Sequence, residues 1–157
     1  MKVSKVLIEQ DEIEQKVKEL AERINKDYSG EELVIVGILK GAFIVISDLA
    51  KQLNVDVTFE FMSIQSYEGT KSTGQIKIDK DLDIDITGKN ILIVEDIFDT
   101  GLTISHLKNL LESRNPKTIE ILCMFIKKDV ATEPVDIKYS GFELSLIHIS
   151  EPTRRTS

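Results

Sequence analysis

The chain has a single cysteine, no tryptophan and only three prolines among its 157 residues. One cysteine cannot form an internal disulfide, so a packed core is expected to hold the fold, as is usual in a reducing compartment. Cys123 lies inside an apolar run, which favours a small buried side chain over a reactive thiol. No apolar stretch reaches the ~20 residues of a membrane-spanning helix, and the N-terminus lacks the apolar core of a signal peptide. These absences predict a cytoplasmic protein that does not enter membranes.

Acidic residues outnumber basic ones. Lys and Arg number 20 against 27 Asp and Glu, which gives a net charge of −7, and the chain has no extended basic run. A chain of this charge is not expected to bind nucleic acid, whose phosphates attract basic surfaces. With 41% hydrophobic residues, a chain of this length is expected to bury a sizeable core as one domain.

Apolar periodicity alternates between helical and strand patterns along the chain. Asp11 and Glu14 have the spacing of a capping box, which predicts an amphipathic helix after them. Later segments are predicted as a strand (33–38), a helix ending near Leu53, an edge-proximal strand (55–61), a polar loop (63–74), a short strand at Ile76 and Ile78, a strand (91–94), a helix (101–113) and a strand (119–126). Strands that alternate with helices predict an α/β fold with a mostly parallel sheet.

The most informative stretch is residues 91–104, where an unbroken apolar run is followed by adjacent acids. An apolar run of this kind suits a strand buried on both faces, and acids are costly there unless the strand has ended. Glu95 and Asp96 are therefore expected at the strand's carboxyl edge, which is the edge where open α/β sheets bind ligands.

Turn-forming residues come next and lead into a helical pattern. Asp99, Thr100, Gly101 and Thr103 can direct backbone N–H groups and hydroxyls at an anion at the start of that helix. An acidic pair or an Asp-Thr-Gly turn alone is more often an ordinary loop or helix cap. Together, the acidic pair and the turn predict a binding site for a polyol phosphate with a divalent cation. The chain lacks the P-loop lysine pattern, which disfavours a Walker-type nucleotide triphosphatase.

Residues 94–103 resemble the phosphoribosyl pyrophosphate (PRPP) motif of the type I phosphoribosyltransferases, and more closely that of the hypoxanthine-guanine phosphoribosyltransferases. The resemblance runs from about residue 6 to Glu143. It implies a phosphoribosyltransferase domain over residues 1–143, with a central, mostly parallel sheet flanked by helices and a flexible active-site loop.

The resemblance also implies an activity: transfer of 5-phosphoribosyl from PRPP to hypoxanthine or guanine in purine salvage, which gives IMP or GMP and pyrophosphate. Glu95 and Asp96 would hold the ribose hydroxyls, directly or through Mg²⁺. Residues 99–103, Leu102 among them, would bind the 5′-phosphate, and Asp99 would accept the purine N7 proton.

Three further segments gain roles from the same resemblance. Lys40 and Gly41 match a loop that binds pyrophosphate and has a cis peptide before the lysine, at Leu39-Lys40. Ser66 and Tyr67 match a flexible loop that closes over the active site. Lys127, with Lys128 as the alternative, would donate to the exocyclic oxygen of a 6-oxopurine.

The resemblance ends in a tail, residues 144–157, where an aromatic that stacks on the purine and a later aspartate are missing. This tail reads as unrelated sequence after a truncated gene and is expected to be poorly ordered. Two other functions stay open. One is a phosphoribosyltransferase for xanthine or adenine, and the other is a PRPP-sensing RNA-binding regulator, which the net charge of −7 disfavours. A homodimer or homotetramer is expected.

Overall fold

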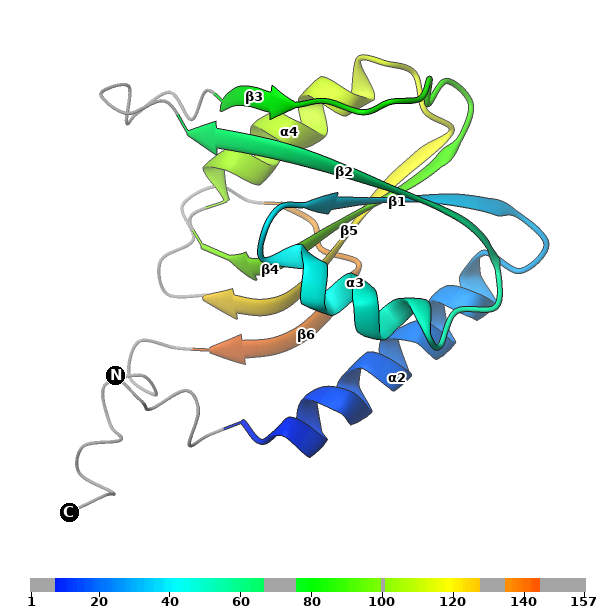
Figure 1. Cartoon of the computed structure of the whole chain (residues 1–157), viewed down its shortest axis with the longest axis vertical. Coiled ribbons are helices and arrows are strands. Elements are labelled where there is room, and N and C mark those ends of the chain that lie inside the picture. Colours follow the sequence, from blue (N-terminus) through cyan, green and yellow to red (C-terminus); the bar gives the residue numbers. More distant parts are fainter. Residues whose placement is uncertain (1–7, 67–75, 100, 128–134, 145–157) are drawn as a thin grey trace.

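Six strands form one sheet in the order β3-β2-β1-β4-β5-β6 in this computed structural model, which describes residues 8–66, 76–99, 101–127 and 135–144 (Figure 1). In chain order the elements are α2 (Gln10–Asp27), β1 (Glu32–Ile38), α3 (Ala42–Ala50), β2 (Asp56–Ser66), β3 (Ile76–Lys80), β4 (Asn90–Phe98), α4 (Leu102–Glu112), β5 (Thr118–Lys127) and β6 (Tyr139–Leu144). Within this described part, no helix is long and apolar enough to cross a membrane.

The sheet is parallel except at one edge. β1 pairs with β2 and β4, β4 with β5, and β5 with β6, all in parallel, whereas the edge strand β3 runs antiparallel to β2. The prediction of a mostly parallel α/β sheet is therefore confirmed. β2 lies next to the edge strand, as its half-exposed alternation indicated.

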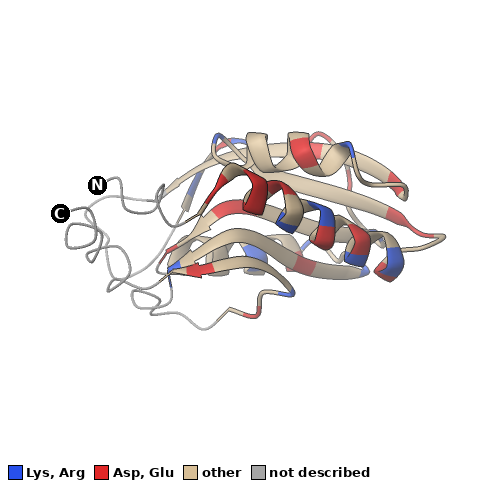
Figure 2. Ribbon diagram, turned by 90° about the horizontal axis from the view of Figure 1, so that it is seen from below, with Lys and Arg blue, Asp and Glu red and all other residues tan. Residues whose placement is uncertain are grey.

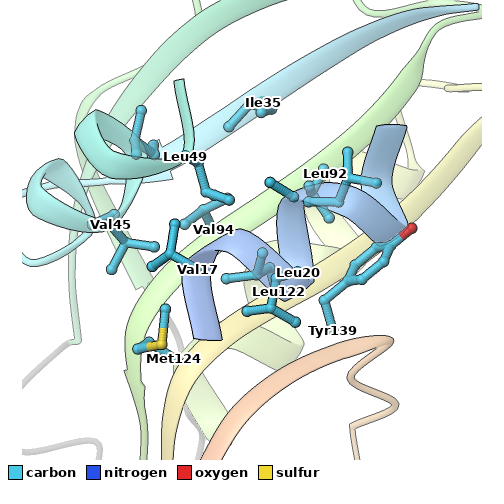
Figure 3. Packing of buried hydrophobic residues seen from close by; sticks show 14 of the residues in the cluster. Val17, Leu20, Ile35, Val45, Leu49, Leu92, Val94, Leu122, Met124 and Tyr139 are labelled. Carbon is cyan, nitrogen blue, oxygen red and sulfur yellow. The ribbon is translucent and has the colours of Figure 1, made fainter. Parts of the chain in front are cut away.

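Each face of the sheet has its own core, and β4 contributes to both. Leu92 and Val94 pack with α2 and α3 on one face (Figure 3), while Ile91 and Ile93 pack with α4 on the other. Successive strand residues point to opposite faces. Burial on both faces therefore explains why this run is uninterrupted. Cys123 is fully buried in the α4 core, which confirms its prediction as a small core residue.

Two element boundaries differ from the prediction. The backbone of Glu9 is extended (φ −84°, ψ 158°) and its N–H donates to Oε1 of Glu12 at 2.8 Å, so the capping pair lies two residues before the predicted Asp11 and Glu14. β2 continues to Ser66, so residues 63–66 are strand rather than loop. Pairing with β3 explains this extension, since strand hydrogen bonds outweigh the weak strand propensity of a polar segment.

β6 is a strand that periodicity did not predict. Tyr139 begins it fully buried, and its hydroxyl donates to Oδ2 of Asp27 at 2.5 Å, on α2. The Arg23 guanidinium lies 4.9 Å from the centre of the Tyr139 ring and donates to the carbonyl of Lys138 at 3.0 Å. These contacts fasten the edge strand to the first described helix.

We expect Tyr139→Phe to lower the free energy of unfolding by about 1 kcal/mol, because Asp27 loses the hydroxyl while the ring stays in place. Tyr139→Leu, which also removes the ring beneath Arg23, should cost more than twice as much. Urea unfolding of the three proteins measures both differences. A Tyr139→Phe protein as stable as the parent would show that the hydroxyl adds nothing to the attachment of β6.

Candidate active site

The end of β4 extends past its neighbour β1. Pairing between the two strands ends at Gly37 and Val94, whereas pairing of β4 with β5 continues to Phe98 and Ile126. Glu95 and Asp96 therefore lie near the carboxyl end of β4, as predicted, although the strand continues through them rather than ending before them. The acids are tolerated because this segment has a strand on one side only, which leaves both side chains half-buried.

This overhang lies where the strand order reverses. β1 leads through α3 to β2 on one side, and β4 leads through α4 to β5 on the other. The carboxyl ends of β1 and β4 thus flank a topological switch point, the place where open α/β sheets bind ligands.

A cavity of about 280 Å³ opens at this switch point and is called the first cavity here. Its lining residues are Ile38, Leu39, Ile64, Glu95, Ile97, Phe98, Asp99, Gly101, Thr103 and Ile104. The structure thus brings together four predicted site residues: an acid of β4, the acid after it, and two residues at the start of α4. Thr100 lies outside the described residues, and Leu102 begins α4.

Gly101 makes the turn from β4 into α4. Its φ of 92° is in the left-handed region, which a side chain disfavours, and its carbonyl accepts the first helical bond, from Ser105 N–H at 2.9 Å. Because Gly101 and Thr103 both line the first cavity, the cavity borders the N-terminal end of a helix. Such ends favour anions, phosphates above all.

The acids of β4 are held in a setting that disfavours their charge. Burial raises the pKa of Glu95 from its ordinary 4.5 to about 7, the negative charge of Asp96 adds to this, and the Asp96 N–H, which donates to Oε1 of Glu95 at 2.9 Å, opposes it. Burial also raises the pKa of Asp96. Two such carboxylates favour the approach of hydroxyl donors or a cation.

The two acids nevertheless face different sides of the sheet. Glu95 lines the first cavity, whereas Asp96 lines a second cavity of about 210 Å³ between the sheet, α2 and α3. Lining residues of this second cavity are Gln10, Ile13, Val17, Gly41, Ile44, Val45, Asp48, Asp96, Met124 and Phe125. Gly41, predicted to bind pyrophosphate, is thus beside Asp96 rather than Glu95.

The remaining predicted residues that the structure describes do not line the first cavity. The Leu39-Lys40 peptide is cis, as predicted, and Lys40 is exposed directly after β1. Lys127 is the last residue of β5 and lines neither cavity. Ser66 ends β2, while Tyr67 and Lys128 lie outside the described residues.

Apolar residues of the first cavity were missed by the sequence interpretation. Ile97 is 43% exposed and lines the cavity beside Phe98, so β4 supplies an apolar wall as well as an acid. The available signal was an isoleucine and a phenylalanine between Asp96 and Asp99, where a solvated turn would favour polar residues.

Comparison with known proteins agrees with this geometry. A family model of the phosphoribosyl transferase domain matches residues 7–154, which extends past Glu143. The hypoxanthine-guanine phosphoribosyltransferase of Dictyostelium discoideum is 43% identical over 149 residues, covering 92% of this chain and 83% of that protein. That of Aquifex aeolicus is 44% identical over 142 residues, covering 89% and 80%.

Solved structures show the same likeness. A crystal structure of a hypoxanthine-guanine phosphoribosyltransferase from Bacillus anthracis superposes with a TM-score of 0.84 at 39% identity, covering 87% of this chain and 82% of that one. Sequence and fold therefore agree, and the chain belongs to the phosphoribosyltransferase family and, within it, to the hypoxanthine-guanine phosphoribosyltransferases.

Proposed function

We propose that the chain transfers the 5-phosphoribosyl group of PRPP to hypoxanthine or guanine in purine salvage, giving IMP or GMP and pyrophosphate. The observation that carries this proposal is the convergence of Glu95, Asp99, Gly101 and Thr103 on one cavity at the switch point. Relatives of this name, about two-fifths identical in sequence, support the choice of bases. The family resemblance supports a cytoplasmic homodimer or homotetramer.

The two ends of PRPP would bind at separate loops. Gly101 and Thr103 border the cavity at the start of α4 and suit the 5′-phosphate, with Thr100 and Leu102 completing the loop by resemblance. Lys40 and Gly41 follow β1 on the other side of the overhang and suit the pyrophosphate.

Between these loops lie the acids for the ribose and its metal ion. The described residues contain no group of three or more His, Cys, Asp or Glu that could hold a metal by itself. Mg²⁺ commonly binds through one or two carboxylates together with substrate oxygens and water. Glu95 lines the first cavity and fits that role through the ribose hydroxyls, and the family resemblance assigns Asp96 to it as well. When bound, Mg²⁺ would neutralise charge on the pyrophosphate.

In the reaction, a purine nitrogen forms a bond to ribose C1 while the bond from C1 to the pyrophosphate oxygen breaks, and pyrophosphate leaves with the electron pair. Positive charge develops on the ribose, where the carboxylate of Glu95 stabilises it. Asp99 accepts the N7 proton of the purine, and Lys127 donates to the 6-oxygen. The apolar side chain of Ile97 offers a surface for the base, and closure of the loop with Ser66 and Tyr67 would exclude water.

Two alternatives predict different results in simple assays. A donor at Lys127 disfavours adenine, which has no 6-oxygen, so turnover of labelled hypoxanthine, guanine, xanthine and adenine identifies the base. Acidic residues are interspersed with basic ones on α2 (Figure 2), and the net charge is −7, which gives an RNA-binding regulator little support. An RNA gel shift tests the regulator directly.

Asp99→Asn should lower turnover by roughly 10²–10⁴-fold, because the amide keeps the size of the side chain but cannot accept the purine proton. PRPP affinity, measured by calorimetry, should stay within error. The exposed Asp83→Asn serves as the control for loss of one carboxylate. Near-normal turnover of the Asp99→Asn protein would remove Asp99 from the role of base.

Gly101→Val should abolish measurable PRPP binding, because a branched side chain disfavours a φ of 92° and obstructs approach of the phosphate to the backbone. Gly88→Val is a matched control, since Gly88 has a φ of 75° with open space around it, before β4. Both variants should be less stable than the parent, but only Gly101→Val should lose the ability to bind PRPP. Equal calorimetric affinity in the two would reject the phosphate site.

Glu95→Gln should change the pH dependence of stability in the ligand-free protein. The folded-state pKa of Glu95, about 7, lies above the ordinary 4.5, so ionisation increasingly destabilises the fold as pH rises from about 4.5 to 7. Glutamine does not ionise. The free energy of unfolding of the Glu95→Gln protein, relative to that of the parent, should therefore change little at pH 5 and rise by roughly 2–3 kcal/mol by pH 8. Urea unfolding measures it, with the exposed Glu22→Gln as control; a constant difference across pH would contradict the expected shift.

A further inference from the structure

Gly41 has a backbone that does not require glycine. Its φ of −59° and ψ of −36° are ordinary right-handed values that any residue adopts. A methyl group at this position would nevertheless lie 3.0 Å from Cβ, 3.3 Å from Oδ2 and 3.6 Å from Cγ of Asp96. Space, rather than conformation, therefore explains the glycine, and the side chain that takes up the space is Asp96.

Asp96 is held firmly by β4 and β5. Its N–H donates to Oε1 of Glu95 at 2.9 Å, and the residues on either side of it, Glu95 and Ile97, pair with Cys123 and Phe125 of β5. The side chain is half-buried on the α2 and α3 face, where it lines the second cavity together with Gly41. A crowded residue 41 would therefore move more easily than Asp96.

The loop that carries Gly41 is short and held at both ends. Leu39 N–H donates to the carbonyl of Met62 at 2.9 Å, and Phe43 N–H donates to the carbonyl of Lys40 at 3.1 Å. Because residue 41 lies between these two hydrogen bonds and next to Lys40, a shift of its backbone should also shift Lys40. Leu39 lines the first cavity, so this loop borders the same space as Glu95 and Asp99.

We propose that Asp96 is a positioning residue for the loop at residues 39–41: its side chain packs against Gly41 and sets the distance between the pyrophosphate end and the rest of the site. This inference rests on the proposed function and deepens it. It adds to Asp96 a task that Glu95 does not share, since Glu95 lines the first cavity whereas Asp96 lies against Gly41 beside the second.

The test is a double-mutant cycle that compares the parent, Gly41→Ala, Asp96→Gly and the double variant. Gly41→Ala should raise KM for PRPP and the inhibition constant of pyrophosphate by roughly tenfold, within the range for overpacking, with a smaller change in kcat. Asp96→Gly removes all three crowding atoms. In that background the same Gly41→Ala change should alter KM less than twofold, whatever Asp96→Gly does alone.

Asp96→Ala provides a graded control, because it keeps the nearest atom, Cβ, and removes the two farther ones. Gly41→Ala should therefore be only partly tolerated in this background. An equal effect of Gly41→Ala in all three backgrounds would overturn the inference and leave the contact without consequence for substrate binding.

Thermal unfolding gives a second, activity-independent readout of the same cycle. Crowding predicts that Gly41→Ala lowers Tm in the parent and not in the Asp96→Gly protein, even if one variant is inactive. If the parent itself does not bind PRPP, the proposed function fails, while this stability cycle still decides whether Asp96 restricts residue 41. Equal Tm losses in both backgrounds would contradict the contact.

Discussion

Burial of β4 on both faces is the constraint on which the rest of the structure depends. Leu92 and Val94 fill one core and Ile91 and Ile93 the other, so no polar side chain fits along this part of the strand. Polar chemistry is thereby confined to the segment that extends past β1, and to the turn that follows. The same burial that stabilises the domain decides where its site can be.

Alternation along a strand then divides the polar segment between two faces. Glu95 and Asp96 are neighbours in sequence, yet one lines the first cavity and the other lies against Gly41 on the α2 and α3 side. A single strand end therefore reaches both loops that flank it. The loops that precede α3 and α4 are therefore both positioned by the same strand, β4.

Much of this could be predicted from local pattern. The apolar runs at 91–94 and 119–126, with the helical spacing between them, predicted the strand–helix–strand unit, and motifs of the resembled family predicted the loop at residues 39–41. The continuation of β4 through two acids could not be predicted, because it depends on β1 ending earlier than β5. β6 was missed because its anchor joins Tyr139 to Asp27, 112 residues apart in sequence.

The raised pKa of Glu95 shows the energetic cost of this design. A carboxylate held half-buried beside a second acid destabilises the folded protein when it ionises, and the two cores on either side of β4 must offset that cost. The cost falls when a hydroxyl donor, a cation or a developing positive charge comes within reach of the carboxylate. A carboxylate in this setting interacts weakly with a neutral, unreactive ribose and more strongly with one whose bond to pyrophosphate is breaking. Stronger binding of the transition state than of the ground state lowers the activation barrier.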